Sequence, residues 1–133
     1  MRRIQDVMHS PVVSIDAEKS VYEAAVLMEH HKIGSIVALE GDRPVGILTE
    51  RDFVGLIAKE KVSASSLKVV NLMTKAPITI GADSTVDEAG ELMTRQGIRR
   101  LLVVERNKLV GIVTNRDILL TLLEGLGYES MYA

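Results

Sequence analysis

The feature that most constrains the fold is an internal repeat, because the sequence matches itself without a gap when it is shifted by 65 residues. The stretch GILTERD at residues 46–52 returns as GIVTNRD at residues 111–117. The same shift places Met8 on Met73 and Met28 on Met93. A repeat of this length indicates two similar structural units in one chain. We therefore expect one repeat over residues 1–62 and a second over residues 63–133.

Each repeat predicts the same order of elements: strand, helix, strand, strand, helix. A short apolar strand comes first, and a Ser/Thr-x-x-Glu capping box then predicts the start of a helix. Two strands joined by a short polar turn predict a hairpin, and a second helix closes the repeat. The strands are expected at 12–15 and 78–80, the capping boxes at Ser20 with Glu23 and Thr85 with Glu88, and the closing helices at 50–59 and 115–124, with a linker at 59–66.

The expected fold is α+β, with two tandem β-α-β-β-α repeats. A unit of about 60 residues buries too little surface to be more than marginally stable alone. We therefore expect the two repeats to pack against each other about a pseudo-twofold axis. The two repeated frames would then lie on opposite sides of a cleft.

Composition excludes several classes of function. The formal net charge is −2, so no general positive field attracts nucleic acid or an anionic membrane. The chain has one Phe, three Tyr and no Trp, too few rings for a base-stacking platform. It has no Cys, no apolar run of membrane-spanning length and no apolar core typical of a secretory signal near its N-terminus. We expect a cytoplasmic protein with no membrane partner, and nucleic acid is not an expected ligand.

The repeated frame Gly-Ile-x-Thr-x-Arg-Asp allows two interpretations. In the structural one, the Thr49 hydroxyl caps the backbone N–H of Asp52, and the Asp52 carboxylate favours the positive end of the helix. Thr114 and Asp117 would do the same. In the functional one, the helix N-terminus presents N–H groups to an anion, and the carboxylate accepts two hydrogen bonds from a ribose diol.

The arginine before each aspartate, Arg51 or Arg116, favours the functional interpretation. A cation is unfavourable at the positive end of a helix. A guanidinium can, however, donate charge-assisted hydrogen bonds to a phosphate or pair with a carboxylate across an interface. An anion or a partner therefore explains these arginines better than helix stability does.

Over nearly its whole length the chain resembles a cystathionine β-synthase (CBS) domain pair. The resemblance rests on M-x-x-P-V-V-S-I, S-V-Y-E-A-A-x-L-M, I-G-S-I-V and G-I-L-T-E-R-D in the first repeat. The second repeat supplies L-M-T-K-A-P-I-T-I, T-V-D-E-A, G-I-R-R-L-L-V-V and G-I-V-T-N-R-D. The resemblance implies a stand-alone regulatory module that binds AMP, ADP, ATP or S-adenosylmethionine in the cleft between its repeats. Such a module needs no cofactor and performs no catalysis.

The resemblance also implies roles for individual residues. Ribose and phosphate would be held by Thr49, Asp52, Thr114 and Asp117, and phosphate also by Arg99, Arg100, Arg51 and Arg116. The adenine pockets would be lined by Pro11, Val12, Ile33, Gly34 and Ser35 in one site and by Ala76, Pro77, Ile78 and Ile98 in the other. Because Gly34 and Ser35 stand where the second repeat has Arg99 and Arg100, we expect the two sites to be unequal.

The expected partners are a second copy of the chain and an effector protein. The stretch ILLTLLEGL at residues 118–126 carries Leu or Ile on three faces of a helix, which predicts a homodimer. A rival interpretation is an interaction module whose Thr and Asp residues are only caps and which binds no ligand.

Neither a catalytic set nor a metal site is expected, because His30 and His31 point in different directions on a helix and His9 is the only other histidine.

Overall fold

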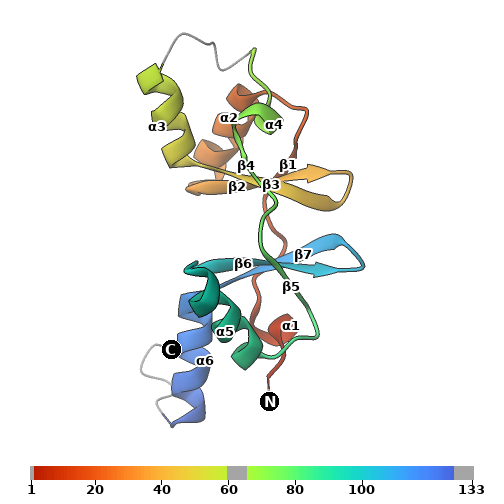
Figure 1. Cartoon of the computed structure of the whole chain (residues 1–133), viewed down its shortest axis with the longest axis vertical. Helices are drawn as coiled ribbons and strands as arrows, with labels where there is room; N and C mark the ends of the chain where they lie inside the picture. Colours follow the sequence, from red (N-terminus) through yellow and green to blue (C-terminus); the bar gives the residue numbers. More distant parts are fainter. Residues whose placement is uncertain (1, 60–65, 128–133) are drawn as a thin grey trace. The chain divides into compact units, whose positions relative to one another are not determined.

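The computed structural model describes residues 2–59 and 66–127 (Figure 1). They form two compact units that do not coincide with the two sequence repeats. The Asp52 unit contains residues 13–77, and the Asp117 unit contains residues 1–12 together with residues from 78 onward. Each unit therefore takes a short leading segment from the other repeat. Most of the expected linker, residues 60–65, and the end of the chain from residue 128 lie outside the described residues.

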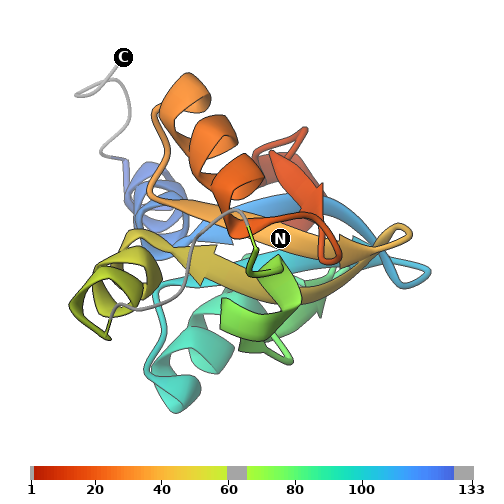
Figure 2. The same cartoon turned by 90° about the horizontal axis from the view of Figure 1, so that it is seen from above.

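The Asp52 unit is a four-stranded sheet with helices on one face. Its strands are β1 (Ser14–Asp16), β2 (Ser35–Glu40), β3 (Arg43–Thr49) and β4 (Thr74–Lys75), in the order β1-β2-β3-β4. Its helices are α2 (Val21–His31), α3 (Glu50–Lys59) and α4 (Val69–Leu72). β1 pairs parallel with β2, and the other pairs are antiparallel. Figures 1 and 2 show the helices gathered on one side of this sheet.

The Asp117 unit repeats this plan with one strand reduced to a single bridge. Its strands are β5 (Thr79–Gly81), β6 (Arg100–Glu105) and β7 (Lys108–Thr114), and its helices are α1 (Ile4–Val7), α5 (Val86–Gln96) and α6 (Asn115–Gly125). His9 forms an isolated antiparallel bridge with Ile112 in β7. Thr74 of β4 pairs in the same way with Ile47, the repeat equivalent of Ile112. The α+β class and the two repeats are thus confirmed.

The first long helix of each repeat begins at the predicted capping box. Ser20 accepts from the Glu23 backbone N–H at 3.0 Å, and Thr85 accepts from that of Glu88 at 3.1 Å. The glutamate carboxylates accept in return from the backbone N–H groups of Ser20 and Thr85. Reciprocal bonds of this kind satisfy N–H groups that a helix cannot pair internally, which fixes where each helix starts.

The leading segments are held by methionines that pack on glycines. Met73 lies against Gly46, and Met8 lies against Gly111, so closely that a Cβ atom at either glycine would overlap the sulfur. Ile4 of α1 and Val69 of α4 are fully buried in the cores of the units that receive them. The repeated Gly of each frame is therefore needed for close packing of the exchanged segment, the role expected of a glycine within a strand.

Candidate functional site

The two Thr/Asp frames stand where a strand passes directly into a helix. In the Asp117 unit, the Thr114 backbone N–H and hydroxyl donate to Oδ2 of Asp117 at 2.8 and 2.9 Å, and the Asp117 N–H donates to Thr114 Oγ1 at 3.2 Å. In the Asp52 unit, the Thr49 N–H and hydroxyl donate to Oδ2 of Asp52 at 2.8 and 3.1 Å. The capping bond expected from the sequence is therefore present in the Asp117 unit, and in the Asp52 unit Thr49 and Asp52 are joined by the two bonds that Thr49 donates.

Both carboxylates are half-buried, whereas the arginines beside them are exposed. Arg51 and Arg116 lie in the first turns of α3 and α6 with their side chains in solvent. Within the part of the chain that the structure describes, neither guanidinium forms an ion pair. The fold of each unit thus gives no structural reason for a cation at these helix starts.

A histidine that sequence reasoning did not assign to the site contacts one carboxylate. Nε2 of His9 lies 2.8 Å from Oδ1 of Asp117, and the side chain of Asp117 is only 14% exposed. Burial by itself would raise the pKa of Asp117, but hydrogen bonds from His9 and then from Thr114 outweigh burial and hold that pKa below its ordinary value. The hydrogen bonds from His9 and Thr114 thus favour the ionised form of this carboxylate.

The remaining predicted residues divide between the two units. The Asp117 unit contains nine of them: Pro11, Val12, Ile78, Ile98, Arg99, Arg100, Thr114, Arg116 and Asp117. The Asp52 unit contains the other eight: Ile33, Gly34, Ser35, Thr49, Arg51, Asp52, Ala76 and Pro77. The adenine-pocket residues were grouped by their order in the sequence, so the exchange of leading segments changes that grouping. Pro11 and Val12 accompany Asp117, and Ala76 and Pro77 accompany Asp52.

The charge beside the frames differs between the units. The backbone N–H of Asn115 donates to the carbonyl of Arg99 at 2.8 Å, and the N–H of Glu50 donates to the carbonyl of Gly34 at 3.0 Å. These are equivalent positions in the two repeats. In the Asp117 unit the junction carries a guanidinium and an amide. In the Asp52 unit it carries only the Glu50 carboxylate, which lies over Gly34.

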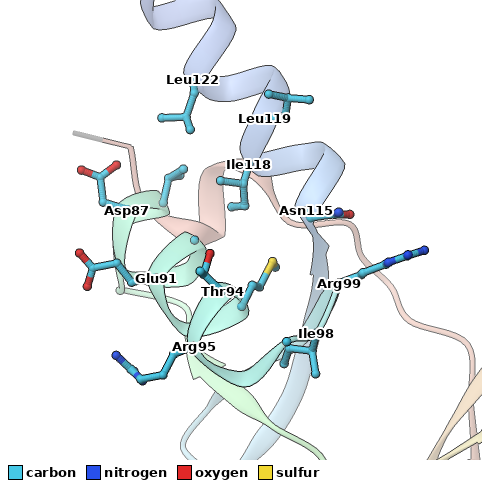
Figure 3. Close-up of a pocket in the computed structure, with 14 residues that line it drawn as sticks. Asp87, Glu91, Thr94, Arg95, Ile98, Arg99, Asn115, Ile118, Leu119 and Leu122 are labelled. Atoms are coloured by element: carbon cyan, nitrogen blue, oxygen red, sulfur yellow. The ribbon is translucent and has the colours of Figure 1, made fainter.

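A groove of the Asp117 unit lies between α5 and α6 (Figure 3) and borders the frame at Asn115. It has a volume of about 1030 Å³. Of the predicted site residues, Ile98 and Arg99 line it, whereas Thr114 and Asp117 do not. Figure 3 shows Ile118 projecting from α6 toward the groove, with Leu119 and Leu122 on the same helix. The groove is therefore a mainly apolar surface between helices, next to the frame but not lined by its threonine or aspartate.

Neither a metal-binding cluster nor a membrane-spanning helix is found among the described residues. Residues 2–59 and 66–127 contain no cluster of three His, Asp or Glu side chains suited to a metal ion. No helix within those ranges is both long enough and apolar enough to span a bilayer.

Comparison with known families gives matches to both repeats. A model of the CBS domain matches residues 4–59 and 69–124. An uncharacterized protein of Methanopyrus kandleri is 38% identical over 87% of this chain, which spans 60% of that relative. The YlbB protein of Bacillus subtilis is 36% identical over 91% of the chain and 82% of its own length. An inosine-5'-monophosphate dehydrogenase of Korarchaeum cryptofilum is 36% identical over 89% of the chain, but the match covers only 24% of that enzyme.

Solved structures with the same fold include ligand complexes. A CBS-domain protein of Pyrobaculum aerophilum complexed with AMP has a TM-score of 0.77 and 27% identity, with 92% of this chain and 99% of that chain covered. The CBS domain pair of protein MJ0100, in complex with 5'-methylthioadenosine and S-adenosyl-L-methionine, has a TM-score of 0.75 and 26% identity, with 95% and 98% covered.

Proposed function

Because the chain belongs to the CBS-domain family, we propose that it is a regulatory module that binds an adenosine-containing ligand and performs no catalysis of its own. The observation that carries the proposal is the pair of ionisable, half-buried carboxylates, Asp52 and Asp117, each fixed at a helix start by a threonine. Such a carboxylate can accept two hydrogen bonds from a ribose diol. The complexes of related pairs with AMP and with S-adenosyl-L-methionine support this ligand class.

Each carboxylate would hold one ribose. In the Asp117 site, phosphate would be bound by Thr114, Arg99, Arg100 and Arg116. In the Asp52 site, it would be bound by Thr49 and Arg51. The apolar residues near each frame would contact adenine. These roles follow from the family resemblance together with the division of the residues between the two units.

The two sites should prefer different charges. At the strand–helix junction, the Asp117 unit has the Arg99 guanidinium and the neutral Asn115, whereas the equivalent positions in the Asp52 unit are Gly34 and the Glu50 carboxylate. A carboxylate repels phosphate and attracts a cation such as a sulfonium. Phosphorylated nucleosides should therefore favour the Asp117 site.

The output of the module would pass through other proteins. We propose a cytoplasmic homodimer that signals to an effector protein. The leucines that α6 exposes support assembly with another chain. The alternative is an interaction module in which the frames act only as helix caps. The capping bonds are present under both interpretations, so ligand binding must discriminate between them.

The deciding experiment is calorimetric titration with AMP, ADP, ATP, S-adenosylmethionine and NAD. Binding of at least one ligand to the wild type, and loss of that binding in an Asp52→Ala/Asp117→Ala double variant, is the expected result. The charge preference is tested with Arg100→Gln, which should weaken ATP more than adenosine because adenosine has no charge for a guanidinium to meet. If a folded wild-type protein binds none of these ligands, the interaction module is the better description.

A further inference from the structure

The Asp117 carboxylate differs from its repeat equivalent because an imidazole already occupies one of its oxygens. His9 comes from the leading segment, and its backbone is fixed by two hydrogen bonds to Ile112, of 2.8 and 3.0 Å. This strand-like pairing places the ring over the start of α6, with Nε2 at 2.8 Å from Oδ1 of Asp117. The ring itself is 67% exposed, so it can move without disturbing a packed core.

The acceptor positions of the two carboxylates are consequently used to different extents. An ionised carboxylate offers about four lone-pair positions on its two oxygens. In Asp117, Thr114 takes two of these on Oδ2, and His9 takes one on Oδ1. A ribose diol that needs two acceptor positions must therefore displace His9 or share Oδ1 with it.

The Asp52 unit has no imidazole at the equivalent place. The residue that corresponds to His9 is Thr74, which pairs with Ile47 in the register that His9 has with Ile112. Within its unit, the Asp52 carboxylate accepts from Thr49 through Oδ2. At this position the two units therefore share the backbone pairing and differ in the side chain.

We propose that His9 is a specificity-determining residue of the Asp117 site, where it competes with a ribose hydroxyl for Oδ1 of Asp117 and weakens the binding of uncharged nucleosides. The inference rests on the proposed function, since it takes Asp117 as a ribose ligand. A phosphorylated nucleoside should be weakened less, because an N–H group of the displaced imidazole can donate to its phosphate. His9 would therefore bias this site toward phosphorylated ligands, in addition to the charge supplied by Arg99.

The test exchanges the two residues between the repeats and uses adenosine and AMP as probes. His9→Thr is made in an Asp52→Ala background, which leaves the Asp117 site, and Thr74→His is made in an Asp117→Ala background, which leaves the Asp52 site. Calorimetry should show that His9→Thr tightens adenosine binding by about three- to tenfold, the effect of losing one competing hydrogen bond of ordinary net strength. AMP affinity should change less. Thr74→His should weaken adenosine at the other site.

A second readout separates competition from a purely structural role. Addition of AMP to the wild type should move the imidazole resonance of His9 in the NMR spectrum. If adenosine and AMP bind but His9→Thr leaves both affinities unchanged, the inference is wrong while the proposed function stands. If neither probe binds the folded wild type, nor any other adenosine ligand, both fail. Should His9→Thr not fold, His9→Ala in the same background also removes the competing donor and provides the affinity comparison.

Discussion

At the scale of single residues, each frame aspartate serves a helix and, in the proposed function, a ligand. Asp117→Ala removes the bonds from Thr114, and Asp52→Ala removes those from Thr49. We expect each change to cost about 1 kcal/mol of folding free energy, as for the loss of a helix cap. Loss of a bidentate ribose contact should cost about 1.5–3 kcal/mol of binding at the altered site. Urea unfolding measures the loss of folding free energy, and calorimetry measures the loss of binding free energy. A loss of stability with unchanged ligand affinity would mean that the aspartates are only caps.

The stability of the protein should depend on pH through Asp117. The pKa of Asp117 is held below its ordinary value, because bonds from His9 and Thr114 outweigh the opposing effect of burial. Between the lowered pKa of Asp117 in the folded protein and its ordinary pKa in the unfolded chain, the unfolded chain binds more protons than the native state. The free energy of unfolding therefore falls as the pH falls. The contribution of Asp117 should therefore be complete above about pH 4, the ordinary pKa of aspartate, and disappear in more acidic solution.

Urea unfolding of the wild type and Asp117→Asn from pH 7 to pH 3 measures this contribution. The difference in unfolding free energy between the two proteins should be largest at neutral pH and should narrow in acid. A difference that stays constant over this range would show that the ionised carboxylate is not what stabilises the helix start.

At the scale of elements, the frame glycines are required by the exchanged segments. A Cβ atom at Gly111 would overlap Met8, and one at Gly46 would overlap Met73. We expect Gly111→Ala and Gly46→Ala each to destabilise the protein by about 1–3 kcal/mol, the usual effect of overpacking. Gly55 in α3 is the matched control, because a Cβ atom added there would meet nothing within 4 Å. Gly55→Ala should stabilise by about 0.5–1 kcal/mol, and thermal unfolding of all three variants distinguishes packing from backbone effects.

The elements with strong local signals are the ones that the sequence predicts well. Ser20 and Thr85 cap helices through bonds to residues three positions away, and each hairpin joins neighbouring strands, so both are visible in a short window. α1, α4 and β4 have four, four and two residues, which is too short for a periodic pattern. Nothing local indicates that residues 2–12 pack with the second repeat, because that pairing depends on contacts about a hundred residues apart.

The frame residues that the sequence predicts are repeated in both halves of the chain, and the site residue that it misses, His9, is not. Asp52 and Asp117 stand out because they recur in a frame. His9 does not recur, since the shift places it on Thr74. Its contact with Asp117 spans 108 residues and depends on the exchange of the leading segment. The neighbouring Met8 and Met73 match, but the repeat differs at His9 and at the positions that follow it, so comparison of the repeats gives no signal for this contact.

At the scale of the whole molecule, close repetition of the fold is combined with unequal chemistry in the two units. The units share strand order, helix caps and methionine–glycine packing, all of which the duplication preserves. They differ in side chains that fold formation does not require, namely His9, Arg99 and Asn115 against Thr74, Gly34 and Glu50. The shared residues maintain the scaffold, and the unshared residues are free to set a different ligand preference in each unit.

Exposed leucines near the end of the described chain predict assembly. Three leucines on and just after α6 are exposed, Leu119 by 55%, Leu122 by 48% and Leu126 by 73%, and two of them line the apolar groove beside α5. Contiguous exposed apolar surface of this kind marks an interaction site in a protein that remains in solution. We expect the wild type to sediment as a dimer, and Leu119→Glu/Leu122→Glu to shift it to monomer with an unchanged circular-dichroism spectrum.

Arg106→Glu in the turn between β6 and β7 is the control for added negative charge, because that turn is exposed and lies outside the groove. It should leave the sedimentation coefficient of the dimer unchanged. Since dissociation follows mass action, a weak dimer would also separate on dilution, so sedimentation is measured over a wide range of protein concentration. A wild type that is monomeric at every concentration would contradict the prediction and would leave the exposed leucines for the effector protein to cover.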